Sequence, residues 1–172
     1  IMNRDTKKLC IMGLLAALTC AATMIIKVPI TATGGYINIG DSMVLICAVF
    51  FGPEYGLIAG GIGSALGDLL GGYFNWALAT VIIKGIEGLA VAKIAGTPNK
   101  GSFLNLRKVS ACVIGLVWMV AGYFAADYII GGSIAASIAG ISANSIQAVF
   151  SFIVFIVLGF ALYKAKIQNY ID

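Results

Sequence analysis

Histidine is absent from this chain of 172 residues, and charged residues make up only 10% of it. Soluble domains usually carry about 25% charged side chains, because their exterior must be solvated. Hydrophobic residues account for 60% of the chain and are spread along its whole length. We therefore expect lipid to be the main solvent of the outer surface, and the composition leaves no room for a sizeable soluble domain.

The lack of histidine and of paired cysteines narrows the possible chemistry. The four cysteines lie in or beside apolar segments without the spacing of a zinc site or a disulfide framework, at Cys10, Cys20, Cys47 and Cys112. They are expected to be small buried hydrophobes. The usual nucleophile–base and metal sets of an intramembrane enzyme cannot be assembled from these residues. We therefore expect no enzyme activity, no metal and no cofactor.

A phosphate-binding loop is also missing, since no segment matches Gly-x-x-x-x-Gly-Lys-Ser/Thr. If the protein takes part in ATP-driven transport, the hydrolysis must occur on another chain. A protein that moves a solute without such partners, as a small secondary carrier or channel, remains an alternative.

Six apolar segments alternate with short connections. A helix needs roughly 20 residues to cross a hydrocarbon core of about 30 Å. The sequence therefore predicts an all-α fold, an integral membrane bundle of six transmembrane helices that forms a single domain over residues 1–172. The expected spans are 8–28, 42–51, 55–70, 77–95, 109–128 and 144–163. The Gly/Ser/Ala-rich stretch 129–143 is compatible with either a loop or a helix.

Basic residues gather at the ends of the apolar segments. Nine of the eleven fall on one side of a six-span bundle, namely Arg4, Lys7, Lys8, Lys93, Lys100, Arg107, Lys108, Lys164 and Lys166. Positive residues favour the cytoplasmic side, so both termini are expected there and the connection at 29–41 outside. A nucleic-acid partner would need a basic face interleaved with polar or aromatic residues, and we expect none.

Small residues recur at intervals of four in two of the spans. The first span carries Gly13, Ala17 and Ala21, and the third carries the rows Gly56–Gly60–Ser64 and Gly63–Gly67–Gly71. Helices in lipid approach closely where such residues form a smooth face. Packing inside the bundle is the simpler interpretation for the third span. For the first span, internal packing and docking to a partner protein are both open.

Ionisable residues inside a span cost about 2.5–3.5 kcal/mol each on insertion scales, so they are expected to face a cavity or a partner. Lys84 and Glu87 are three residues apart, on one helical face, and form either a structural ion pair or part of a ligand site. Asp68 lies near the outer end of its span, in the interface or in the pocket. Asn144 and Gln147 either bond neighbouring helices or offer amides to a nitrogen heterocycle.

Aromatic and amide side chains occupy the two connections on the expected outer face. They are Tyr36 and Asn38 in the first, and Tyr73, Asn75 and Trp76 in the second. Such residues often only anchor a protein at the membrane interface. Together with the polar residues of the spans, however, they match the composition of a small-molecule site with apolar walls and a few convergent polar groups. Glycines in the first connection would let it move as a lid.

Several motifs, in order along nearly the whole chain, resemble the S components of energy-coupling factor (ECF) transporters, which take up vitamins. They are Ala17-x-x-x-Ala21, Gly-Gly-Tyr-Ile-Asn-Ile-Gly-Asp at 34–41, Phe-Gly-Pro-Glu-Tyr-Gly at 51–56, Gly-x-Gly-Ser-Ala-Leu-Gly-Asp at 61–68, Ile-Lys-Gly-Ile-Glu-Gly at 83–88 and Asn-x-x-Gln at 144–147. The chain is most similar to the branch associated with hydroxymethylpyrimidine and pyridoxine-type substrates.

This resemblance implies a substrate-binding subunit in a bacterial plasma membrane. An S component of this kind captures its vitamin on the outer face, with the first outer connection as a gate. It then joins a transmembrane T component and two cytoplasmic ATPases. The stripe that carries Ala17 and Ala21 would contact the T component, and the whole subunit would topple to carry its site inward.

Overall fold

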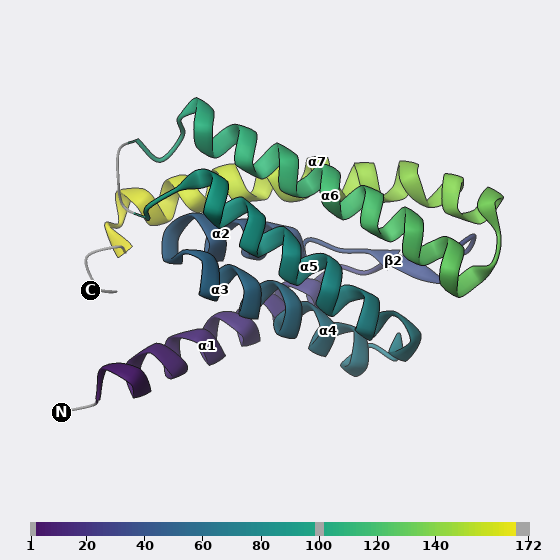
Figure 1. The fold of residues 1–172 in the computed structure, drawn as a ribbon, viewed down its shortest axis with the longest axis horizontal. Helices are drawn as coiled ribbons and strands as arrows, with labels where there is room; N and C mark the ends of the chain where they lie inside the picture. The colour runs from purple at the N-terminus through teal and green to yellow at the C-terminus, as the bar shows by residue number, and fades with distance from the viewer. Residues whose placement is uncertain (1–2, 99–101, 168–172) are drawn as a thin grey trace.

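The computed structural model describes residues 3–98 and 102–167, which form a helical bundle with one small hairpin (Figure 1). Its elements, in chain order, are α1 (Arg4–Ile25), β1 (Val28–Ile30), β2 (Gly35–Ile37), α2 (Gly40–Phe51), α3 (Pro53–Ile58), the π-helical turn η1 (Ala59–Gly63), α4 (Ser64–Leu70), α5 (Phe74–Ala95), α6 (Leu106–Gly131) and α7 (Ile134–Lys164). The pieces α3, η1 and α4 follow one another without a break and form one helical segment. Apart from the short hairpin, every element is helical, so the predicted all-α fold is confirmed. Three helices, α1, α6 and α7, are long and apolar enough to cross a membrane.

Two boundaries differ from the expectation. The predicted connection before the fourth span is shorter, because α5 already begins at Phe74 and includes Asn75 and Trp76. The ambiguous stretch 129–143 is mostly helical. Gly132 ends α6 in the left-handed conformation, with φ of 65°, and the Ser133 side chain caps α7 by accepting a hydrogen bond from the Ala136 backbone N–H.

The two glycine rows of the third segment pack inside the bundle, as predicted. A Cβ at Gly56 would meet the backbone of Gly88, and one at Gly60 would overlap the carbonyl oxygen of Lys84, so this face touches α5. On the other row, a Cβ at Gly63 or Gly67 would clash with α1. Glycine fits these positions because the neighbouring helix lies too close to leave space for a side chain.

The stripe on α1 lies on the outside of the described bundle. Gly13, Ala17 and Ala21 are all exposed, and a Cβ built on Gly13 would meet no atom within 4 Å. The face that packs inward is a different one, with Leu15 and Thr19 among its buried residues. Internal packing therefore does not account for the small residues of this stripe.

The ends of the bundle differ in character (Figure 1). α1 begins and α7 ends at the end where α5 leads into α6, and the β1–β2 hairpin lies at the opposite end. This arrangement agrees with the predicted grouping of basic residues, although Lys100 lies outside the described residues. The six-span topology and the cytoplasmic placement of both termini stay predictions.

The hairpin leads into the short helix α2, which is shorter than a full-length span. β1 and β2 are antiparallel, with Pro29 opposite Tyr36, and Gly34 takes a left-handed φ of 68° in the turn. The 12 residues of α2 extend only about 18 Å at 1.5 Å per residue, less than a hydrocarbon core of about 30 Å. The first turn of α2 therefore starts inside the bundle, and Asp41 in that turn is fully buried.

Candidate ligand-binding site

A small cavity lies between the hairpin and the helices α4 to α7. Its volume is about 30 Å³, and its wall is formed by three aromatic residues, two amides, two carboxylates and two threonines: Tyr36, Trp76, Tyr123, Asn38, Asn144, Asp68, Asp127, Thr33 and Thr80. Nonpolar contact comes from Ile30 and Gly35. A space of this size holds about one water molecule. The cavity as it stands is therefore too small for a ring-sized ligand.

Tyr36 of the hairpin connects the cavity to α4. Its hydroxyl donates a hydrogen bond of 2.5 Å to Asp68 Oδ1, and its ring lies 4.3 Å from that of Tyr73. The ammonium of Lys27 lies over the Tyr36 ring, 4.9 Å from its centroid. Burial, and then the hydrogen bond to Asp68, raise the pKa of the Tyr36 phenol well above its usual range. Tyr36 is thus a neutral donor that fixes one oxygen of Asp68.

The C-terminal stem of the hairpin is attached to α7 by hydrogen bonds. The backbone N–H of Asn38 donates to Gln147 Oε1 at 2.8 Å, and Gln147 Nε2 donates to Asp41 Oδ2 at 2.8 Å. The Asn38 side chain accepts from the Gly40 backbone N–H at 2.8 Å, which shapes the turn into α2. Gln147 therefore connects the hairpin to the first turn of α2.

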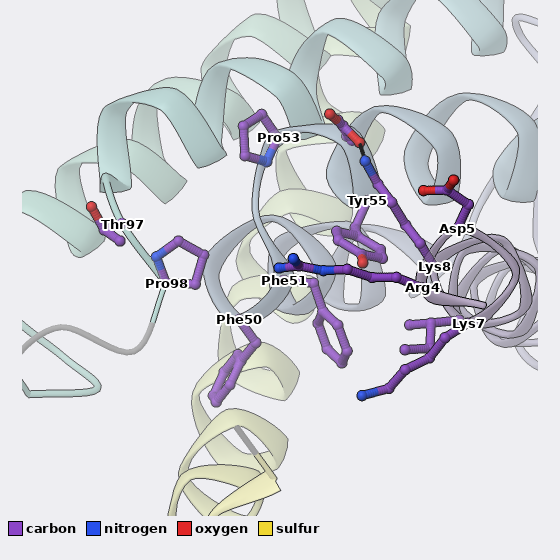
Figure 2. A pocket seen from close by; sticks show the side chains of 12 residues that line it. Arg4, Asp5, Lys7, Lys8, Phe50, Phe51, Pro53, Tyr55, Thr97 and Pro98 are labelled. Atoms are coloured by element: carbon purple, nitrogen blue, oxygen red, sulfur yellow. Dashed lines mark ion pairs between the residues drawn. The ribbon is translucent and has the colours of Figure 1, made fainter. Parts of the chain in front are cut away.

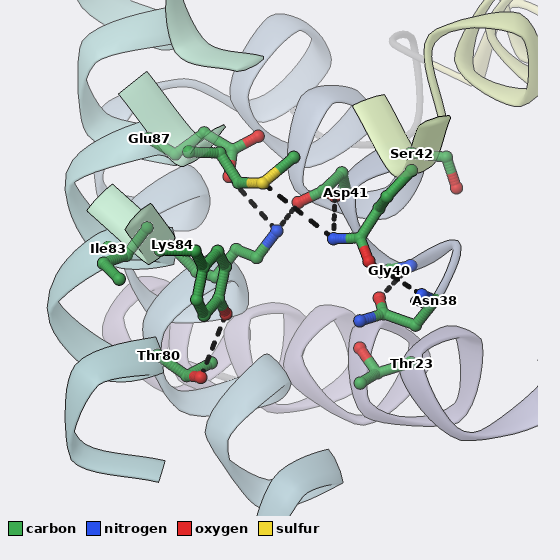
Figure 3. Close-up of polar contacts among 12 residues, drawn as sticks. Thr23, Asn38, Gly40, Asp41, Ser42, Thr80, Ile83, Lys84 and Glu87 are labelled. Carbon is green, nitrogen blue, oxygen red and sulfur yellow. Dashed lines mark hydrogen bonds and ion pairs between the residues drawn. The ribbon is translucent and has the colours of Figure 1, made fainter. Parts of the chain in front are cut away.

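A buried ion cluster lies beside this connection (Figure 3). Lys84 on α5 donates to Asp41 and lies 3.6 Å from Glu87, and all three residues are at most 2% exposed. The sequence left open whether Lys84 pairs with Glu87 or contacts ligand; the structure shows the ion pair, and Asp41 is an additional partner. Asp41 also occupies the N-terminal turn of α2, where the helix dipole favours a carboxylate. One cation thus serves two carboxylates.

The structure brings together half of the predicted ligand residues. Five of them line the cavity: Tyr36, Asn38, Asp68, Trp76 and Asn144. Tyr73 packs on Tyr36 behind the wall. Lys84, Glu87 and Gln147 belong to the ion cluster and its connection to the hairpin, and Lys84 approaches the cavity wall through Tyr123, whose ring centroid lies 5.4 Å from its ammonium. Asn75 is exposed in the first turn of α5.

Sequence reasoning missed several residues of the site. Asp127 is a single acid within an apolar helix, and the rule that intramembrane ionisable residues mark functional sites would have identified it. Asp41 was expected in a surface connection, whereas it is the main partner of Lys84. Tyr123 and Thr80 hydrogen-bond each other at 3.0 Å, and no local pattern in the sequence predicts that contact.

A larger hollow of about 770 Å³ opens at the other end of the bundle (Figure 2). Arg4, Lys7 and Lys8 of α1 lie on one side of it, and Thr97 and Pro98 lie on the other. Lys8 forms an ion pair with Glu54. The residues that line this hollow include none of the predicted ligand residues, and it lies at the end opposite the hairpin. The small cavity, which five of the predicted residues line, is therefore the candidate ligand site.

Comparison with known proteins gives three matches. The family model described as "ECF-type riboflavin transporter, S component" matches residues 3–164. An uncharacterized protein of Pyrococcus woesei is 41% identical over 143 residues, which cover 83% of this chain and 92% of that protein. The thiamine precursor transporter HmpT of Lactococcus lactis subsp. cremoris (strain MG1363) is 30% identical over 171 residues, 97% of this chain and 94% of the transporter.

Proposed function

The chain belongs to the family of ECF-type transporter S components, and from this membership we propose that it captures a small vitamin precursor of the hydroxymethylpyrimidine or pyridoxine type. It is a membrane-embedded transport subunit and not an enzyme, as the family shows. In the proposed cycle it binds the ligand on the outer face of the plasma membrane. It then delivers the ligand inward with a T component and two ATPases.

The cavity under the hairpin is the observation that carries this proposal. Three aromatic rings and a few amide and carboxylate groups converge there, which is the composition expected of a site for a small heterocycle. The relative named as a thiamine precursor transporter aligns over almost the whole chain. Both observations favour a single-ring ligand.

Ligand binding requires the hairpin to move, because the cavity has room for only about one water molecule. The hairpin contributes Tyr36 to the cavity wall, and Asn38 follows directly after β2. We propose that β1–β2 is the gate, held shut by the Tyr36–Asp68 and Asn38–Gln147 hydrogen bonds. Riboflavin, which the family description names, is much bulkier than one pyrimidine ring and would need a larger displacement.

The test is equilibrium binding to the purified protein in detergent or nanodiscs. The panel contains hydroxymethylpyrimidine, pyridoxine, thiamin, riboflavin and folate, and we expect saturable binding of a single-ring compound. Tightest binding of riboflavin would correct the ligand and keep the transport role. Failure to bind any compound of the panel would overturn the proposed function.

Transport itself distinguishes this proposal from a self-sufficient carrier or channel. Proteoliposomes that contain the chain alone should take up no ligand, since it carries no phosphate-binding loop. Addition of a T component and the two ATPases should give uptake that depends on ATP. Flux through the isolated chain, driven by an ion gradient, would contradict the assignment.

A further inference from the structure

Asp127 has no role in the contacts described so far. It lies on α6, lines the cavity and is only 4% exposed. Its Oδ2 atom has no hydrogen-bond partner, and its carboxylate makes no ion pair, within residues 3–98 and 102–167. Buried polar atoms are nearly always hydrogen-bonded, so an orphaned carboxylate oxygen at a cavity requires an explanation.

The space around Asp127 is shaped for its carboxylate. A Cβ built on Gly140 of α7 would overlap Asp127 Oδ2, so glycine at residue 140 leaves room for the carboxylate where it lies. The same Cβ would lie 3.2 Å from the Thr33 methyl group of the hairpin turn. Helices α6 and α7 and the gate therefore meet at this acid.

Asp68 supplies a second such oxygen from another helix. It lies on α4, is 4% exposed and also lines the cavity. Its Oδ1 accepts from Tyr36, whereas its Oδ2 has no hydrogen-bond partner within the described chain. The cavity thus contains two carboxylate oxygens that can accept hydrogen bonds, beside the aromatic rings of Trp76 and Tyr123.

The nearby cations do not cancel this negative charge. Lys84 already serves Asp41 and Glu87. Lys27 donates to the carbonyl of Gly67 at 3.3 Å and lies over the Tyr36 ring. Two carboxylates therefore line the cavity, and neither Lys27 nor Lys84 is among the residues that line it. Such a site attracts hydrogen-bond donors and positive charge, and it repels anions.

We propose that Asp127, together with Asp68, accepts the N–H groups of an amino-substituted or protonated nitrogen heterocycle, and that the same carboxylates exclude phosphorylated forms of that ring. This inference rests on the proposed function, whose ligand class it narrows. The aromatic walls take the face of the ring, and a cationic ring gains further from the π systems.

Wild-type protein alone can test the proposal, with ligands that share one ring. The series is 4-amino-5-hydroxymethyl-2-methylpyrimidine, its 4-oxo counterpart and its phosphate monoester. Binding is measured by calorimetry and by tryptophan fluorescence. We expect the amino compound to bind at least about tenfold more tightly than the oxo compound, which lacks the exocyclic amino donor and keeps only a ring N–H. The phosphate ester should bind about a hundredfold more weakly than its parent, or not measurably.

Variants then assign the effect to the carboxylates. Asp127→Asn keeps the size of the side chain but removes its charge and one acceptor, so the preference for the amino compound should fall to about threefold or less. Asp68→Asn should act in the same direction. Asp5→Asn, an exposed site on α1 at the other end of the bundle, is the matched control and should leave all three affinities unchanged.

The outcomes separate this inference from the proposed function. Similar affinities for the three pyrimidines, or an unchanged amino preference in Asp127→Asn and Asp68→Asn, overturn the inference and leave the transport role in place. Lack of binding to every compound of the wider panel overturns the proposed function itself. If the variants fail to fold in detergent, the wild-type ligand series still tests the inference, because similar affinities for the amino, oxo and phosphate compounds would overturn it.

Discussion

Lys84 balances two buried carboxylates, Asp41 and Glu87, so its removal should affect both stability and binding. Loss of one partner of a buried ion pair costs about 3–5 kcal/mol, because it leaves an uncompensated charge in a medium of low dielectric constant. We expect Lys84→Met to lower the thermal unfolding temperature of the detergent-solubilised protein markedly. Binding should weaken too, since Asp41 also positions Gln147, which holds the hairpin.

Lys93→Met is the control for this prediction. Lys93 lies on the same helix, α5, but is exposed in its last turn. Its replacement should change the unfolding temperature little, as expected for surface substitutions. Equal unfolding temperatures for the two variants would show that the ion cluster contributes nothing to stability.

Asn144 and Asn75 provide a matched pair for the ligand site. Both were predicted to contact ligand, but Asn144 is buried at the cavity and Asn75 is exposed. Loss of a buried hydrogen-bond partner costs about 1–3 kcal/mol, so Asn144→Ala should weaken ligand binding roughly tenfold or more. Asn75→Ala should bind like wild type. The opposite ranking, measured by calorimetry, would move the site away from this cavity.

At the residue scale, the sequence could predict contacts within one element better than contacts between elements. Lys84 and Glu87 are three apart on a helix, so helical periodicity placed them on one face and made an ion pair one of two open interpretations. Asp41 is 43 residues from Lys84 and was not recognised as its partner, because the contact depends on where α2 begins inside the bundle. Asp127 was overlooked although its setting in an apolar helix was visible.

The exposed stripe on α1 is the element for which the structure gives the clearest expectation. Gly13, Ala17 and Ala21 make no use of their small size within the described bundle. We propose that they face the T component, where a close approach of helices requires a smooth surface. Ala17→Trp and Ala21→Trp should therefore abolish ATP-dependent uptake by the assembled transporter and leave ligand binding to the isolated subunit intact.

Ala125→Trp serves as the control for the stripe. Ala125 is an exposed alanine on α6, which lies across the bundle from α1 (Figure 1). The tryptophan there meets lipid, so both uptake and ligand binding should be retained. Normal uptake with Ala17→Trp and Ala21→Trp, or equal losses with Ala125→Trp, would contradict a docking role for the stripe.

At the element scale, long apolar runs were predicted well and irregular backbone was not. The helices containing 109–128 and 144–163 appear where hydropathy places them, because each satisfies its own backbone hydrogen bonds in lipid. The β1–β2 hairpin was predicted only as a polar connection, since a segment of three-residue strands has too little periodicity to reveal itself. The π-helical turn η1 was also missed, because its sequence, Ala-Gly-Gly-Ile-Gly, is equally compatible with an ordinary α-helix.

The molecule as a whole places two kinds of chemistry at opposite ends. The carboxylate-lined cavity lies under the hairpin, and the basic residues Arg4, Lys7 and Lys8 surround the hollow at the far end. The proposed function, in which the ligand is captured outside and the ATPases act inside, uses this separation. Whether the cavity lies outside the cell depends on which end of the bundle faces the cytoplasm.

Cysteine labelling in intact cells tests that orientation. The starting protein has its four cysteines replaced, and single cysteines are then introduced at Ala32, exposed in the hairpin turn, and at Ser102, exposed between α5 and α6. A thiol reagent that cannot cross the membrane should label Ala32→Cys in intact cells and Ser102→Cys only after permeabilisation. The reverse pattern would place the gate and its cavity in the cytosol, where they could not capture a ligand for import, and the proposed direction of transport would fall with it.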